Sequence, residues 1–289
     1  MREIPLFKLI ERLETAAALD PVIRRVKGVV DGVIRPQWLR DTLHGVWVGH
    51  PLHPIAVQVP VGAWMSAGIL DLLPRTHVGA RTLVGVGVAA AIPTALAGYT
   101  DWARLHDRQL RVGIVHSAAT LVATGLYAAS FLQRAKGRHG SGKALSFTGL
   151  AVVSAAAFLG GHLSYRQAAG VNHAVDTLER FPRGWHPIGS LADLDEGRLM
   201  RRSVGELLLV VYRRGEHVMA LSDACSHLSG PLSEGRLVVG DEPCVECPWH
   251  ASTFSLISGD VVRGPATANQ PRFDTRVVAG TVEVHLPEA

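Results

Sequence analysis

Two short motifs near the C-terminus contain the residue types that bind metals. Cys225 and His227 form a C-x-H motif, and after 19 residues Cys247 and His250 form a C-x-x-H motif. Two thiolates and two imidazoles could bind zinc tetrahedrally. The C-x-H spacing is unusual for zinc. Cys244, the third cysteine of the chain, is left over as a free thiol. Such clustering indicates a metal or redox site more than a disulfide framework.

The loops around both motifs, CSHLSGPLSEG and CPWHASTF, resemble those of the Rieske [2Fe–2S] domain. The resemblance covers roughly 182–289 and implies a small all-β domain that transfers electrons. It also implies that Cys225 and Cys247 hold the inner iron, whereas His227 and His250 hold the outer iron, which takes up the electron. Histidines in place of two thiolates raise the reduction potential of such a cluster. The expected cofactor is therefore a [2Fe–2S] cluster.

Several positions bear on the kind of Rieske protein that the resemblance implies. Rieske proteins of quinol-oxidising complexes have a disulfide at the positions of Gly230 and Trp249, where none can form here. Ser252 stands where that high-potential branch has a serine that donates to a cluster sulfide, and Phe254 replaces its tyrosine. We therefore expect the ferredoxin and oxygenase branch, with an intermediate potential tuned by Ser252. Only 39 residues follow His250, too few for the mononuclear iron domain of an oxygenase, so the chain is not expected to oxygenate substrates by itself.

The first 165 residues contain four apolar segments of about 20 residues each, long enough to cross a ~30 Å hydrocarbon core. Charged residues make up 19% of the chain and the mean hydropathy is +0.19. The alternative is a soluble bundle, whose helices would normally carry a polar stripe that these segments lack. The segments are 54–73, 82–100, 112–132 and 144–164.

The segments and the changes of pattern between them predict an α+β multidomain chain. We expect a four-helix transmembrane bundle followed by a small all-β Rieske domain, whose hairpins turn at Gly215 and Gly280. The N-terminal segment has helical periodicity, and its amphipathic helices either lie on the membrane or pack against the protein. The expected boundaries are amphipathic N-terminal helices at 1–48, transmembrane domain at 49–165, linker at 166–181 and Rieske domain at 182–289.

The region 44–171 resembles an uncharacterised bacterial four-helix membrane family, a domain of unknown function. The matching pieces are GHPLHPIAVQVPVGAW, AGYTDW, the segment with His116, and LGGHLSYRQAAGV. The resemblance implies no established reaction. The last motif of that family often carries a carboxylate where this chain has His162, which is a departure from the family pattern.

Four spans would bring His53, His116, His162 and Asp101 to one side of the membrane. Ionisable groups at membrane depth are costly and usually face the interior of a bundle or a cavity. Paired histidines on facing helices could ligate a haem b, bind another metal ion, line a quinone pocket or relay protons. They could also simply cap helices and bond to neighbouring backbone. The sequence leaves these alternatives open.

A slight excess of Lys and Arg on the N-terminal side predicts that both termini lie in the cytoplasm. We expect a multi-pass protein of the plasma membrane with a cytoplasmic Rieske domain and no signal peptide. The net charge is +4 without a dense basic run, so nucleic acid is not an expected partner. The expected partners are membrane lipid and a reductase, an oxidase or quinone. The predicted function is one-electron transfer, and the alternative is a membrane-anchored redox sensor or docking module.

Overall fold

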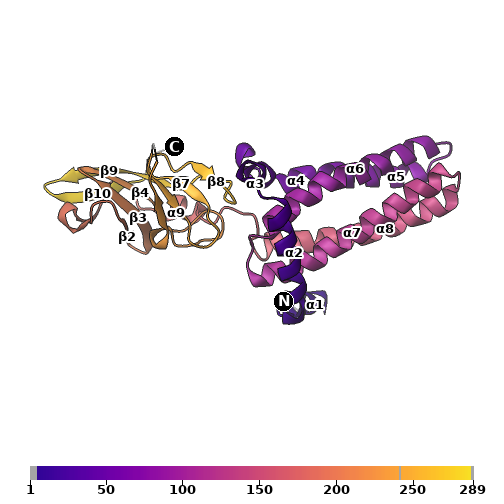
Figure 1. The fold of residues 1–289 in the computed structure, drawn as a ribbon, viewed down its shortest axis with the longest axis horizontal. Helices are drawn as coiled ribbons and strands as arrows, with labels where there is room; N and C mark the ends of the chain where they lie inside the picture. Colours follow the sequence, from indigo (N-terminus) through magenta and orange to yellow (C-terminus); the bar gives the residue numbers. More distant parts are fainter. Residues whose placement is uncertain (1–4, 241, 288–289) are drawn as a thin grey trace. The chain divides into compact units, whose positions relative to one another are not determined.

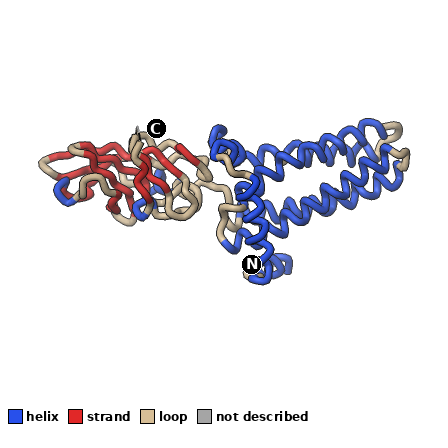
Figure 2. Tube along the Cα trace, in the orientation of Figure 1, coloured by secondary structure: helices blue, strands red, loops and turns tan. Residues whose placement is uncertain are grey.

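The computed structural model describes residues 5–240 and 242–287 (Figure 1). Its internal contacts divide the chain into two compact units. The helical unit comprises the chain up to Arg35 together with Leu52–Ala169, and the β unit comprises Pro36–Pro51 together with Gly170–Ala289. Figure 2 shows that the regular structure of the first unit is helical, whereas the second unit contains the strands together with a few short helices.

Three long helices dominate the helical unit. They are α6 (His77–Trp102), α7 (Asp107–Ala135) and α8 (His139–Tyr165), and each is long and apolar enough to cross a membrane. Only 22% of the apolar window of each helix is buried inside the protein. Most of the apolar surface therefore faces outward, and an outward apolar surface of this extent needs lipid to cover it.

The first predicted span is broken into two helices, α4 (Leu52–Ala56) and α5 (Gln58–Asp71). Pro60 has no N–H group and cannot donate to the carbonyl of Ala56, so one continuous helix would lose a hydrogen bond there. In the first turn of α5 that missing donor costs nothing. The predicted four-helix bundle is thus confirmed in outline, with a first helix in two pieces and three long candidate spans among the described residues.

The interior of the bundle is packed through aromatic rings against small residues. The indole of Trp64 stacks on the ring of Tyr127, with centroids 4.2 Å apart and planes 6° apart. A Cβ atom at Gly87 would lie 2.2 Å from Nε1 of Trp64, so only glycine allows this approach of α5 and α6. Small residues permit close helix packing in the same way across membrane proteins.

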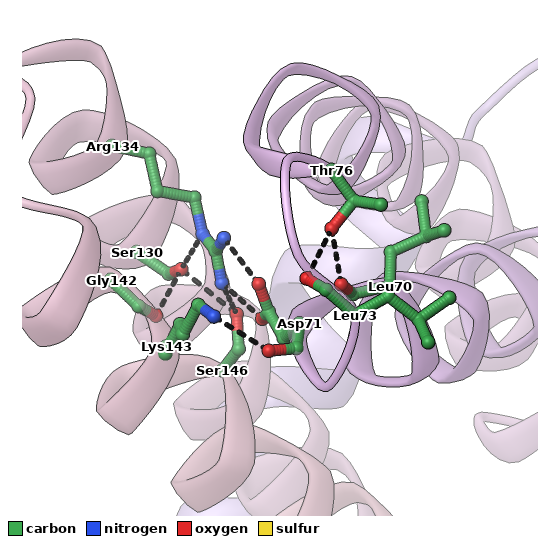
Figure 3. A network of polar contacts seen from close by, with 9 residues as sticks. All are labelled: Leu70, Asp71, Leu73, Thr76, Ser130, Arg134, Gly142, Lys143 and Ser146. Atoms are coloured by element: carbon green, nitrogen blue, oxygen red, sulfur yellow. Dashed lines mark hydrogen bonds and ion pairs between the residues drawn. The ribbon is translucent and has the colours of Figure 1, made fainter.

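A buried ion pair joins the ends of α5 and α7 (Figure 3). The side chains of Asp71 and Arg134 are both 0% exposed, and Nη1 of Arg134 donates to Oδ1 of Asp71 at 2.8 Å. Nε of Arg134 donates to the Ser130 hydroxyl, which donates to the carbonyl of Gly142 in α8. Nζ of Lys143 donates to the carbonyl of Asp71. Every charge in this network has partners, as a buried ion pair requires.

The N-terminal helices α1 (Pro5–Glu14) and α2 (Asp20–Val33) belong to the helical unit, with the short 3₁₀ helix η1 (Ala17–Leu19) between them. Arg111 of α7 donates to both carboxylate oxygens of Asp20, and Arg104 pairs with Asp31. Of the two placements left open by the sequence, packing against the protein is therefore the one observed. A third short helix, α3 (Gln37–His44), is followed by the 3₁₀ helix η2 (Val46–Val48), and both fall in the β unit.

The β unit contains a six-stranded sheet of order β1-β10-β9-β4-β3-β2 and a four-stranded sheet of order β5-β6-β7-β8, with antiparallel neighbours throughout. Both predicted hairpins are present, and Gly215 and Gly280 have the positive φ that their turns require. The strands are β1 (His186–Ser190), β2 (Leu199–Val204), β3 (Leu207–Arg214), β4 (His217–Ser222), β5 (Arg236–Val238), β6 (Cys244–Glu246), β7 (Thr253–Ser255), β8 (Val261–Arg263), β9 (Arg272–Val278) and β10 (Thr281–His285).

Short helices and one loop contact complete the β unit. The helix α9 (Val175–Arg180) precedes the strands, and the 3₁₀ helices η3 (Leu191–Asp193) and η4 (Leu232–Glu234) lie between them. Oδ1 of Asp41 in α3 accepts a hydrogen bond from the backbone N–H of Gly264 at 2.9 Å. Segments more than two hundred residues apart in the chain are thereby joined within one unit.

The ion pair of Asp71 and Arg134 makes a testable prediction. Arg134→Met leaves a carboxylate buried without its partner, which costs about 3–5 kcal/mol of stability. The double variant Asp71→Leu, Arg134→Met removes both charges and should unfold close to the temperature of the unaltered protein. Thermal unfolding of the detergent-solubilised chain measures the difference, and Arg138→Met at an exposed position is the control. A double variant as unstable as the single one would contradict this account.

Candidate metal centre

The two metal-binding motifs lie in loops that close tightly on themselves. Cys225 follows β4, its N–H donates to the carbonyl of Gly230, and its own carbonyl accepts from Ser229. Cys247 begins the loop between β6 and β7, where its N–H donates to the carbonyl of Ser252 and its carbonyl accepts from Ala251. Each loop is therefore a compact turn with a cysteine at its start.

The four predicted ligands come together from these two loops. The rings of His227 and His250 have centroids 5.1 Å apart and planes at 86°. Cys225 and Cys247 are 1% and 4% exposed, whereas both imidazoles are partly exposed. The thiol of Cys225 hydrogen-bonds to the sulfur of Cys247. The site thus has an inner pair of sulfurs and an outer pair of imidazoles.

The surroundings of the two sulfurs shift their pKa values in opposite directions. The hydrogen bond from Cys225 lowers the pKa of Cys247 to about 7, and the backbone N–H groups of Trp249 and His250 act in the same direction. The hydrogen bond to Cys247, together with burial, raises the pKa of Cys225 well above its usual value. Backbone N–H groups of His227 and Leu228 nevertheless point to that sulfur as well. Donors of this kind stabilise thiolates and tune the potential of a cluster that they hold.

Gly230 and Trp249 meet at the position where the sequence resemblance excluded a disulfide. A Cβ atom at Gly230 would lie 2.8 Å from Sγ of Cys247 and 3.1 Å from the indole of Trp249. The absence of a side chain at Gly230 lets the indole close over the first loop. All three cysteines are free, with Cys244 buried in β6. The two loops are therefore held by packing at the position where the resemblance places a disulfide in Rieske proteins of quinol-oxidising complexes.

Two further polar residues support the loops. Ser252 is fully buried, and its Oγ accepts a hydrogen bond from the N–H of Ala266 at 3.0 Å. The hydroxyl proton of Ser252 remains available to donate. Gln270, also buried, accepts from the N–H of Ser226 and donates to the carbonyls of Ser222 and Ala224, which precede the first motif. No sequence motif marks Gln270, and only its burial with satisfied partners reveals the role.

The donor set consists of two cysteines and two histidines, the residue types that a Rieske cluster takes. Within residues 5–240 and 242–287, no three His, Cys, Asp or Glu side chains are grouped so that they could hold a single metal ion. A tetrahedral zinc site needs four ligands around one point. A Rieske cluster instead takes two protein ligands on each of two irons, cysteines on one and histidines on the other. The inner sulfurs and the outer imidazoles divide in this way.

The three histidines predicted to lie together in the bundle do not form one group. Two of them, His53 and His116, lie close to each other. Nδ1 of His53 hydrogen-bonds to the carbonyl of Thr94 at 2.9 Å, and Nδ1 of His116 to the carbonyl of Ala156 at 2.8 Å. The two rings have centroids 6.4 Å apart and planes at 83°.

His162 and Asp101, the other two predicted members of that group, have other surroundings. Nε2 of His162 lies 2.9 Å from the carboxylate of Glu14 in α1, a partner that the sequence did not indicate. Asp101 lies in the last turn of α6. The structure therefore pairs His53 with His116 and pairs His162 with the N-terminal helix.

Comparison with known proteins matches each part of the chain to a family. Residues 184–276 match the Rieske [2Fe-2S] domain, and residues 49–173 match a family described as Predicted membrane protein (DUF2231). The match to a family of predicted membrane proteins agrees with the long apolar helices of the helical unit.

The curated relatives of the β unit are ferredoxin subunits. The chain is 33% identical over 102 residues to the anthranilate 1,2-dioxygenase ferredoxin subunit of Burkholderia cepacia, covering 35% of this chain and 92% of the relative. It is 34% identical over 99 residues to the 3-phenylpropionate/cinnamic acid dioxygenase ferredoxin subunit of Escherichia coli (strain K12), covering 34% of this chain and 91% of the relative.

Among solved structures, the complex of reduced oxygenase and oxidised ferredoxin in carbazole 1,9a-dioxygenase is similar at 31% identity and a TM-score of 0.33. That match covers 37% of this chain and 98% of the other. With the coverage of the curated ferredoxin subunits, the chain belongs to the Rieske [2Fe-2S] family through its β unit, and a predicted membrane domain precedes that part.

Proposed function

We propose that the protein is a membrane-bound Rieske protein that transfers single electrons. Cys225 and Cys247 hold one iron of a [2Fe–2S] cluster, and His227 and His250 hold the other. The observation that carries the proposal is the convergence of these four side chains from two loops, with the sulfurs buried and the imidazoles partly exposed. The bound cluster supplies a one-electron acceptor at that position.

The protein residues prepare the site for this role. Backbone N–H groups from both loops offset the negative charge of the two thiolates, and burial keeps water from the sulfurs. The partly exposed edge formed by His227 and His250 is where an electron donor or acceptor docks. Because imidazoles can lose a proton on oxidation of the iron that they hold, the potential is expected to fall as pH rises.

The partners follow from the relatives and from the helical unit. Dioxygenase ferredoxin subunits are the relatives of the β unit, so the proposed partner is a reductase or an oxidase that exchanges single electrons with the cluster. The outward apolar surface of α6, α7 and α8 contacts lipid in a multi-pass arrangement. Within the membrane, a haem or quinone site near His53 and His116 offers a second route for the electron.

The cluster assignment makes the first prediction for this function. Purified full-length protein should contain two irons and two acid-labile sulfides per chain. The reduced protein should give an electron paramagnetic resonance signal with an average g below the free-electron value. His227→Cys should shift or abolish that signal, because it replaces an imidazole with a thiolate, whereas Cys244→Ser should leave it unchanged. Zinc without labile sulfide would refute the assignment.

Ser252 makes a second prediction, for the reduction potential. Its hydroxyl is proposed to donate to a cluster sulfide and so to favour the reduced, more negative state. One such hydrogen bond contributes about 1 kcal/mol, and since 59 mV corresponds to about 1.4 kcal/mol for one electron, Ser252→Ala should lower the potential by about 40 mV. Redox titration measures the shift, with Ser258→Ala as the exposed control. An unchanged potential would show that Ser252 acts only on the Ala266 backbone.

The orientation of the chain makes a third prediction. The Lys and Arg bias favours a cytoplasmic β unit. A reporter enzyme that is active only outside the cytoplasm should therefore be inactive when fused after Ala289 and active when inserted between Lys136 and Arg138, in the connection from α7 to α8. A matched reporter that is active only in the cytoplasm should give the opposite pattern. Activity reversed at both positions would place the β unit outside.

A further inference from the structure

The two helical hairpins of the bundle repeat one sequence pattern. In α4–α5 and again in α7, a histidine is followed by glycine nine residues later and by an aromatic residue eleven residues later. In α6 and again in α8, a histidine at the first position is followed by glycine ten and twenty-one residues later. The equivalent residues are His53 and His116, Gly62 and Gly125, Trp64 and Tyr127, His77 and His139, Gly87 and Gly149, and Gly98 and Gly160.

Equivalent residues of the two hairpins meet each other along the bundle. The rings of Trp64 and Tyr127 stack, and so do those of His77 and His139, with centroids 4.4 Å apart. Asp71 and Arg134, which also occupy equivalent positions, form the buried ion pair, and His53 and His116 are the fourth such pair. Residues that lie on a two-fold axis contact their own equivalents. The hairpins are therefore related by an approximate two-fold axis that runs along the bundle, as in parallel repeats of other membrane proteins.

The repeat gives His53 and His116 the same surroundings. Each Nδ1 bonds to a carbonyl of the partner helix in its own hairpin, that of Thr94 or that of Ala156. The glycine four residues later on that helix makes room for the ring, since a Cβ atom at Gly98 would lie 2.7 Å from Nδ1 of His53. A Cβ atom at the equivalent Gly160 would lie 3.3 Å from Cε1 of His116.

These hydrogen bonds determine where the protons are. A backbone carbonyl only accepts, so Nδ1 of each ring carries the proton, and Nε2 of the neutral ring keeps its lone pair. The same arrangement orients histidines that ligate metals in proteins. Nε2 lies on the side of each ring away from the carbonyl that Nδ1 contacts.

The separation of the two rings matches that of two ligands on one metal. An imidazole nitrogen binds a metal at about 2.0–2.1 Å and lies about 1 Å from the centre of its own ring, so two rings on opposite sides of one metal have centroids about 6 Å apart. The observed separation is 6.4 Å. A quinone inserted between the two side chains would need a wider gap, because its own ring would lie between them.

The small number of protein ligands distinguishes between kinds of metal centre. Among the residues that the structure describes, no third His, Cys, Asp or Glu joins this pair in a group that could hold a metal ion. A bare ion would lack ligands with only two imidazoles, whereas a haem iron brings four nitrogens of its own and needs two axial ligands. We propose that His53 and His116 are the axial ligands of a haem b on the two-fold axis of the bundle. Exchange of electrons with the cluster rests on the proposed function, but haem binding does not.

The test uses full-length protein produced in cells supplied with a haem precursor and purified in detergent. Its optical spectrum and pyridine haemochrome should show about one haem b per chain. His53→Ala and His116→Gly should each lose nearly all of the haem but keep the iron–sulfur signal and the elution volume of the unaltered protein. His77→Ala is the matched control, because His77 and His139 form the other histidine pair of the repeat. Their rings lie 14° from parallel and 4.4 Å apart, too close for a metal between them, so this variant should keep its haem.

A rescue experiment separates ligation from a folding defect. Free imidazole added with haem to the His116→Gly protein should restore the low-spin spectrum of a six-coordinate haem, since the small ligand can occupy the space of the missing ring. Haem-free protein with an intact cluster would overturn this proposal and leave the electron-transfer function standing. Haem retained in both His53→Ala and His116→Gly would also overturn it. Unaltered protein that contains haem but no iron–sulfur cluster would contradict the proposed function and leave the haem proposal standing.

Discussion

A buried guanidinium must have a carboxylate beside it, and this requirement governs how the two hairpins of the bundle pair. On a two-fold axis each residue contacts its own equivalent, so the residue type at that position must be able to pack against a second residue of the same type. Aromatic rings and imidazoles do so, as Trp64 with Tyr127 and His53 with His116 show. A charged residue repels its own copy. The axis therefore carries Asp71 on one hairpin and Arg134 on the other, and at this position the repeat has to diverge.

The sequence predicted the features that depend on local pattern. Apolar length predicted the helices of the bundle, alternation and glycine predicted the hairpins at Gly215 and Gly280, and the spacing of cysteine and histidine in the two short motifs predicted the site that the β unit assembles. Each of these signals lies within about twenty neighbouring residues, where side-chain periodicity and turn geometry act directly.

What escaped prediction depends on contacts between distant residues. Glu14 contacts His162, 148 residues later in the chain, and Gln270 bonds to Ser226 of the first motif, 44 residues before it. The break at Val57 results from a proline whose position within a helix turn becomes clear only once the helix start is known. The two-fold repeat also escaped prediction, because its matching histidines and glycines are spread along helices that otherwise differ, and the contacts between equivalent residues reveal it more clearly.

The contact between Asp41 and Gly264 has a consequence for the modular character of the chain. Since Pro36–Pro51 belongs to the β unit, the polypeptide passes between the two units three times rather than once. A fusion of two independent genes would have needed only one junction. The residues between α2 and the first span thus belong to the β unit, and a fragment that begins at residue 182 would lack the carboxylate that accepts from the Gly264 N–H. The two units therefore cannot be separated by cutting the chain at one position.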